Sequence, residues 1–87
     1  MEGQVESQGE ILRDLVEFMV RAIVDAPADV RATVVESGTT VVVELAVARE
    51  DIGKVIGREG GMAQALRTIL ANAGTKLKRR TVLQILD

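Results

Sequence analysis

The residues best suited to binding a ligand lie in the string DIGKVIGREGGMAQALRTIL, residues 51–70. Gly57 and Gly60 stand three apart within an apolar, helix-like pattern, and Lys54 and Arg58 lie beside them. Glycine lets a backbone turn tightly and lets a bulky group approach without meeting a Cβ. The N–H groups that open the next helix can hold phosphate oxygens, and arginine adds charge-assisted hydrogen bonds. The spacing therefore suggests a phosphate-binding loop, with close helix packing as the alternative. Because eight glycines in 87 residues make a chance G-x-x-G match common, the context must decide.

Catalytic chemistry is poorly supported by the composition. The chain has no Cys, His, Tyr or Trp, and its only serines are Ser7 and Ser37, so no nucleophile and base can be assembled. The acidic residues show no metal-ligand spacing, and the glycines do not fit the dinucleotide fingerprint G-x-G-x-x-G. We therefore predict a non-enzyme with no metal, no cofactor and no small-molecule substrate.

Charge is distributed unevenly along the chain. Residues 1–48 carry three basic and nine acidic side chains, net −6, whereas residues 49–87 carry eight basic and four acidic ones, net +4, which together give −2. Such asymmetry suits a protein that binds a polyanion on one face, although chance clustering on a solvated surface explains it equally well. Phe18 is the single aromatic residue, so bases cannot stack on an aromatic platform.

The first half of the chain predicts a helix followed by a hairpin. Apolar residues recur at three and four over residues 10–25, Ser7 and Glu10 form a capping-box pattern, and Pro27 ends the helix. Residues 30–36 and 39–47 are rich in β-branched side chains and are joined by Ser37 and Gly38, which indicates two strands. The second strand is apolar on both faces and is expected in the centre of the sheet.

The second half predicts two helices and a last strand. The helices span residues 49–56 and 62–73, with Leu66, Ile69 and Leu70 facing inward and Gly74 as the stop of the second one. A basic loop precedes a strand at residues 81–86. The order α-β-β-α-α-β predicts an α+β domain in which helices pack on one face of a three-stranded sheet.

The organisation expected is a flexible tail at residues 1–8 and a single domain at residues 9–87. The N-terminal residues are acidic and polar, unlike a signal peptide, and no apolar run has the length of a membrane span. We therefore expect a cytoplasmic protein that does not contact a membrane.

The string EDIGKVIGREGG, in this order of elements, resembles the KH RNA-binding domain of type II, and in particular the small single-domain bacterial proteins of the KhpA type. The resemblance extends over residues 10–87. It implies that residues 9–87 are one KH domain whose I-G-x-x-G loop clamps about four single-stranded nucleotides by their backbone, with little sequence preference. Glu59 departs from the pattern, since its carboxylate repels phosphates.

The resemblance also implies which residues contact RNA. Ile52, Val55 and Ile56 would line one wall of an apolar groove, the last strand would form the other wall, and residues 76–80 would close over it. The implied RNA-binding set is Ile52, Lys54, Val55, Ile56, Gly57, Arg58, Glu59, Gly60, Gly61, Lys76, Lys78, Arg79, Arg80 and Val82.

Partners and cellular role are implied by the resemblance alone. It suggests an RNA chaperone or post-transcriptional regulator with links to cell shape, which forms homodimers or pairs with a larger Jag/KhpB-type KH protein. The alternative is a protein-interaction module whose loop glycines serve packing and not RNA. The two interpretations are compatible, because dimerisation gives a weak RNA-binding groove avidity.

Overall fold

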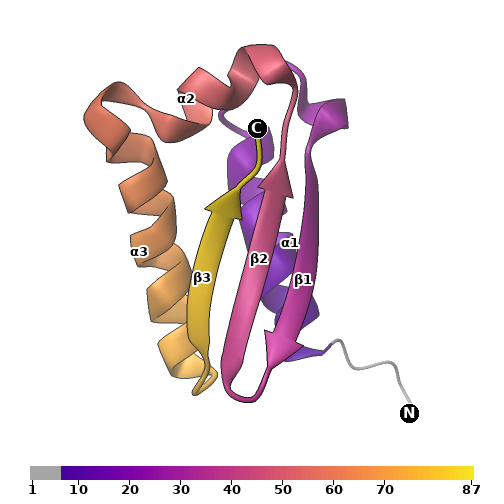
Figure 1. Cartoon of the computed structure of the whole chain (residues 1–87), viewed down its shortest axis with the longest axis vertical. Coiled ribbons are helices and arrows are strands. Elements are labelled where there is room, and N and C mark those ends of the chain that lie inside the picture. Colours follow the sequence, from indigo (N-terminus) through magenta and orange to yellow (C-terminus); the bar gives the residue numbers. More distant parts are fainter. Residues whose placement is uncertain (1–6) are drawn as a thin grey trace.

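A computed structural model describes residues 7–87 and contains, in that part of the chain, a three-stranded sheet with helices packed against it (Figure 1). The elements follow the order α-β-β-α-α-β, which confirms the predicted fold class. Their bounds are α1 Gln8–Arg21, β1 Arg31–Ser37, β2 Thr40–Ala46, α2 Ile52–Ile56, α3 Gly61–Lys76 and β3 Arg80–Ile85. Short 3-10 turns cover Pro27–Asp29, Arg49–Asp51 and Arg58–Gly60.

The strand β2 lies in the centre of the sheet, as predicted. It pairs antiparallel with β1 and parallel with β3. Its side chains alternate: Val41, Val43 and Leu45 are fully buried, whereas Val42 points to the opposite face. The helix α1 lies behind the sheet in Figure 1, so the face toward the viewer stays uncovered along most of its length. The register places Val35, Val42 and Val82 in one row across that face.

The start of α1 follows the predicted capping box. The Ser7 hydroxyl accepts a hydrogen bond from the Glu10 N–H at 3.1 Å, and the Ser7 N–H donates to Glu10 Oε1 at 3.2 Å. Ser7 and Gln8 are predicted as tail, but they are the N-cap and the first residue of α1. The rest of the expected tail, residues 1–6, lies outside the described residues. The helix ends at Arg21, four residues earlier than predicted, because the chain tightens there into i→i+3 bonds such as Ala22 N–H to Met19 O.

The helix α3 is longer than predicted, and Gly74 does not stop it. Gly74 is buried inside the helix, where a Cβ would lie 2.5 Å from Thr81 Cγ2 and 2.8 Å from Arg79 O. Its role is to let the start of β3 approach the helix closely. Leu66 and Leu70 face the core as expected, but Ile69 is 47% exposed, which corrects its predicted inward position.

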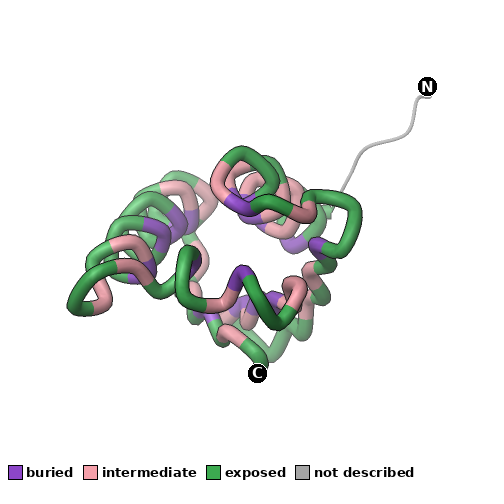
Figure 2. The backbone as a smooth tube through the Cα atoms, turned by 90° about the horizontal axis from the view of Figure 1, so that it is seen from above, coloured by how far each residue is buried: buried purple, intermediate pink, exposed green. Residues whose placement is uncertain are grey.

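The core is aliphatic and lies between the two long helices and the sheet. Buried residues occupy the inner sides of α1 and α3 and the facing side of the sheet when the molecule is seen from above (Figure 2). The fully buried side chains include Leu12, Val16, Val20, Val30 and Val55. Across residues 7–87, every helix is too short or too polar to traverse a bilayer.

Candidate nucleic-acid interface

A groove of about 650 Å³ lies where α2, the start of α3 and the upper half of β3 meet. The structure brings Ile52, Ile56, Gly60 and Val82 of the predicted set together there. Ile56 and Val82 are 41% and 46% exposed, so apolar surface faces the groove from both walls. The lining residues are Val42, Ile52, Ile56, Gly60, Ala63, Arg67, Val82, Leu83, Gln84, Ile85 and Asp87.

The two loop glycines differ in what they do. Gly57 has φ 77° and ψ 173°, a conformation that is essentially restricted to glycine, and a Cβ on it would lie 2.6 Å from both Cβ and N of Met62. Gly60 has φ 77° and ψ 10°, and a Cβ on it would meet no atom within 4 Å. Gly57 is therefore needed for the turn between α2 and α3, whereas Gly60 leaves open surface at the end of the groove.

The charged residues around the loop are not equivalent. Arg58 is exposed and has no ion-pair or hydrogen-bond partner for its side chain among the described residues. Lys54 is paired with Asp25 at 3.1 Å, and this hydrogen bond, together with the charge of Asp25, raises the pKa of Lys54. Glu59 is also exposed, and its φ of 55° places it in the left-handed region. Arg58 is thus the loop cation most accessible to an anion.

Val55 and Gly61 are two residues of the predicted set that do not line the groove. Val55 is fully buried, so its side chain belongs to the core, which corrects its predicted place in the groove wall. The i, i+3, i+4 spacing puts residues 52, 55 and 56 on one side of the helix, so burial and not periodicity separates Val55 from the other two. Gly61 is the first residue of α3, and its N–H already donates to the Arg58 carbonyl.

The predicted basic loop lies at the wrong end of the molecule to close the groove. Lys76 is the last residue of α3 and Arg80 the first of β3, so the connection is only residues 77–79, at the opposite end of α3 from Gly60 (Figure 1). Neither these two residues nor Lys78 or Arg79 lines the groove. Arg79 is held by its own protein: it donates to Glu36 Oε1 at 2.6 Å, Gln8 Oε1 at 3.0 Å and the Thr39 carbonyl at 3.4 Å.

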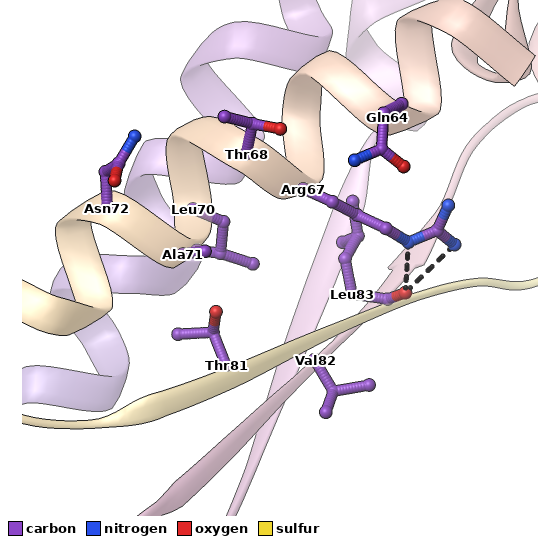
Figure 3. Close-up of a pocket in the computed structure, with 9 residues that line it drawn as sticks. All are labelled: Gln64, Arg67, Thr68, Leu70, Ala71, Asn72, Thr81, Val82 and Leu83. Carbon is purple, nitrogen blue, oxygen red and sulfur yellow. Dashed lines mark hydrogen bonds between the residues drawn. The ribbon is translucent and has the colours of Figure 1, made fainter.

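Arg67 is the main groove residue that sequence reasoning missed. From α3 its Nε and Nη2 donate to the Leu83 carbonyl on β3, at 3.4 and 3.2 Å (Figure 3). The sequence does indicate that Arg67 could face the groove, because Gly60, Ala63 and Arg67 follow the i, i+3, i+7 spacing of residues on one helix face. Val42 carries no such signal, since it reaches the groove only through its register with Val82.

A family model and several curated proteins match most of the chain. A family model described as "KhpA/KhpB, KH domain" matches residues 13–85. The RNA-binding protein KhpA of Aquifex aeolicus is 47% identical, over 87% of this chain and 96% of that protein. Proteins of the same name from Halalkalibacterium halodurans and Borreliella burgdorferi are 45% and 42% identical, over 87% and 85% of this chain and 100% and 90% of their own. No solved structure matches the chain significantly.

Proposed function

Because the chain belongs to the KhpA/KhpB family of KH domains, we propose that it is a non-catalytic RNA-binding protein that clamps about four single-stranded nucleotides at residues 57–60. One observation carries this proposal: an apolar groove ends at Gly60, beside an arginine with no partner within residues 7–87. A cytoplasmic location and a role as an RNA chaperone or post-transcriptional regulator belong to the same proposal.

The clamp works through backbone contact and one cation. The sugar-phosphate chain passes over Gly60, where no Cβ obstructs it, and Arg58 donates charge-assisted hydrogen bonds to phosphate oxygens. The bases enter the groove and contact Ile52 and Ile56 on one wall and Val82 on the other. Aliphatic contacts of this kind distinguish bases poorly, so the expected sequence preference is low.

Two carboxylates limit the affinity. Glu59 is exposed in the loop, and Asp87 lines the groove. Each negative charge repels the phosphate chain, and this repulsion weakens as salt screens it. We therefore expect weak binding to a single copy of the chain, with dissociation constants that depend on salt.

The test is fluorescence anisotropy of a labelled, mixed-sequence single-stranded RNA at two salt concentrations. The decisive variant is Gly60→Asp, since the position has room for the side chain and aspartate tolerates the left-handed region better than most residues. Gly57→Asp is unsuitable, because any Cβ at residue 57 overlaps Met62. The matched control is Gly38→Asp in the hairpin between β1 and β2, where φ is 59° and a Cβ again meets nothing within 4 Å.

The two aspartate variants carry the same added charge and similar backbone strain, so they separate the loop from the rest of the surface. We expect Gly60→Asp to bind RNA at least about tenfold more weakly, a loss of about 1.4 kcal/mol, while Gly38→Asp binds like the native chain. Equal binding by all three proteins, or no binding by the native chain, would exclude the loop clamp.

The exposed Phe18 favours a second and compatible function, association with another protein. This side chain is 76% exposed on the outer face of α1, and Ile11, two turns earlier, is 43% exposed. A homodimer or a pair with a larger Jag/KhpB-type KH protein would cover them and add avidity for RNA. Sedimentation of native and Phe18→Ser chains tests self-association, and an unchanged monomer fraction would count against it.

A further inference from the structure

A second hollow, of about 460 Å³, continues the groove along the open edge of β3 (Figure 3). It shares Arg67, Val82 and Leu83 with the groove, so the two compartments lie on either side of the bridge from Arg67 to the Leu83 carbonyl. We call it the lower pocket. Its lining residues are Gln64, Arg67, Thr68, Leu70, Ala71, Asn72, Thr81, Val82 and Leu83.

The side chains around the lower pocket match the edge of a nucleobase in chemistry. Gln64, Thr68, Asn72 and Thr81 offer amide and hydroxyl groups that both donate and accept hydrogen bonds. Within residues 7–87 none of these four side chains has a hydrogen-bond partner. No carboxylate lines the pocket, in contrast to the groove, where Asp87 is present. Nothing in the lower pocket therefore repels a polyanion.

The backbone of β3 adds further hydrogen-bonding groups. The N–H groups of Arg80 and Leu86 donate toward β2, to Thr39 O and Leu45 O. Because these groups alternate in direction along a strand that pairs on one side, those of Thr81 and Leu83 point to the open edge. Arg67 occupies the Leu83 carbonyl, which leaves the Leu83 N–H and both groups of Thr81 facing the side where the lower pocket lies.

The positively charged Arg67 lies between the groove and the lower pocket. Its guanidinium has five N–H donors, and the Leu83 carbonyl accepts from only two nitrogens, Nε and Nη2. A phosphate that links a base in the groove to a base in the lower pocket would pass beside the remaining donors. The position suits a continuous strand of RNA better than two separate small ligands.

We propose that the lower pocket is an additional nucleotide-binding pocket, which extends the RNA footprint along α3 past Arg67 and beyond the four nucleotides of the loop clamp. The inference rests on the proposed RNA-binding function. The proposal therefore predicts that affinity rises with RNA length. This gain would come from contacts between α3 and β3, far from Gly60, and so can be distinguished from the loop clamp.

The test measures binding of a labelled tetranucleotide and a labelled octanucleotide of the same composition. Ala71→Leu fills the lower pocket, because Ala71 is exposed and lines it, and leucine is a good helix former. Ala65→Leu is the matched control: Ala65 is an exposed alanine of the same helix that lines neither compartment. An octanucleotide also offers more registers to a four-nucleotide site, but this statistical gain is common to all the proteins.

We expect Ala71→Leu to weaken octanucleotide binding by about tenfold, or about 1.4 kcal/mol, and to leave tetranucleotide binding unchanged. Ala65→Leu should bind both as the native chain does. A double variant, Thr68→Ala with Asn72→Ala, should show the same selective loss by removing hydrogen-bonding groups without filling space. If both variants bind the octanucleotide like the native chain while all bind the tetranucleotide, the lower pocket is wrong and the loop clamp stands. If the native chain binds neither RNA, both proposals are wrong.

Discussion

The connections at the two ends of α3 are similar in composition, but within residues 7–87 the arginine of one has no partner for its side chain and the arginine of the other has several. The upper one, residues 57–60, and the lower one, residues 77–79, each contain an arginine and a charged residue in the left-handed region, Glu59 with φ 55° and Lys78 with φ 61°. In the upper connection Arg58 has no partner in the described part of the chain. In the lower one Arg79 is bound by Glu36, Gln8 and Thr39.

The difference shows that the number of basic residues does not locate an anion site. What matters is whether each basic side chain is already paired within the protein. A guanidinium that already donates to a carboxylate at 2.6 Å must lose that ion pair before it can bind phosphate. An unpaired guanidinium beside an open glycine has no such cost. Arg58 is therefore available to an anion, whereas Arg79 contributes to the stability of the fold.

The largest effect is expected inside the upper connection, from Gly57→Ala. The added methyl group overlaps Met62, and the backbone conformation is one that alanine scarcely adopts, so we expect a loss of about 3 kcal/mol or more of unfolding free energy. Urea denaturation followed by circular dichroism measures it.

Gly60→Ala is the control for that experiment, because residue 60 has similar φ but empty space around the position of a Cβ. Its cost should be only about 1 kcal/mol, from the left-handed backbone alone. Equal losses for the two variants would mean that Gly57 has no special packing role.

In the lower connection, Arg79→Ala should reduce stability and leave RNA binding unchanged. The side chain is 17% exposed and joins the connection before β3 to residues at the start of α1 and the end of β1, so we expect a loss of about 1–2 kcal/mol. The neighbouring Arg80 is exposed and unpaired within residues 7–87, and Arg80→Ala should change stability by less than about 0.5 kcal/mol. A large drop in RNA affinity for Arg79→Ala at full folding would contradict the assignment.

This asymmetry between the connections lay beyond the sequence. Periodicity and turn residues predicted the order of elements, the central place of β2 and the capping box at Ser7, because all three depend on neighbours along the chain. The partner of Arg79 is Glu36, 43 positions away, and the buried state of Gly74 depends on where β3 begins. Contacts of that range are set by packing, so a local pattern predicted Gly74 as a helix stop, and the resemblance that named Arg79 gave no sign of its bond to Glu36.

The same limit applies to the candidate site. The I-G-x-x-G string located the loop and two groove residues on α2, since one short segment contains them all. The string gave no reason to place Val55 in the core and Ile52 in the groove, because burial decides this. It also gave no reason to expect different roles for Gly57 and Gly60, because the position of Met62 decides that. Arg67 was missed because its place in the groove depends on its hydrogen bond to the Leu83 carbonyl, a contact between α3 and β3.

A smaller effect, in affinity alone, is expected from Arg58→Ala. Removing the unpaired cation should weaken RNA binding by about threefold to tenfold and lower the dependence of binding on salt, by about 0.7 in the slope of log K against log salt for one lost phosphate contact. Stability should not change, since Arg58 has no partner to lose among the described residues. With a tetranucleotide, which does not extend into the lower pocket, Arg80→Ala removes the same charge at the far end of α3, and an equal loss of affinity would indicate a diffuse electrostatic effect.

The smallest and most discriminating effect compares Glu59→Asn with Lys78→Asn. Both residues have positive φ, and asparagine tolerates that conformation better, so both variants should gain a few tenths of a kcal/mol of stability. Their effects on RNA must differ if the two connections do. Glu59→Asn removes a carboxylate from the path of the phosphates and should strengthen binding severalfold at low salt, with the gain shrinking as salt rises. Lys78→Asn, at the end where the arginine is already paired, should leave the affinity within about twofold of the native value. Anisotropy titrations of the three proteins at two salt concentrations decide the matter: a loss of affinity for Lys78→Asn, without a gain for Glu59→Asn, would move the RNA contact to the lower connection.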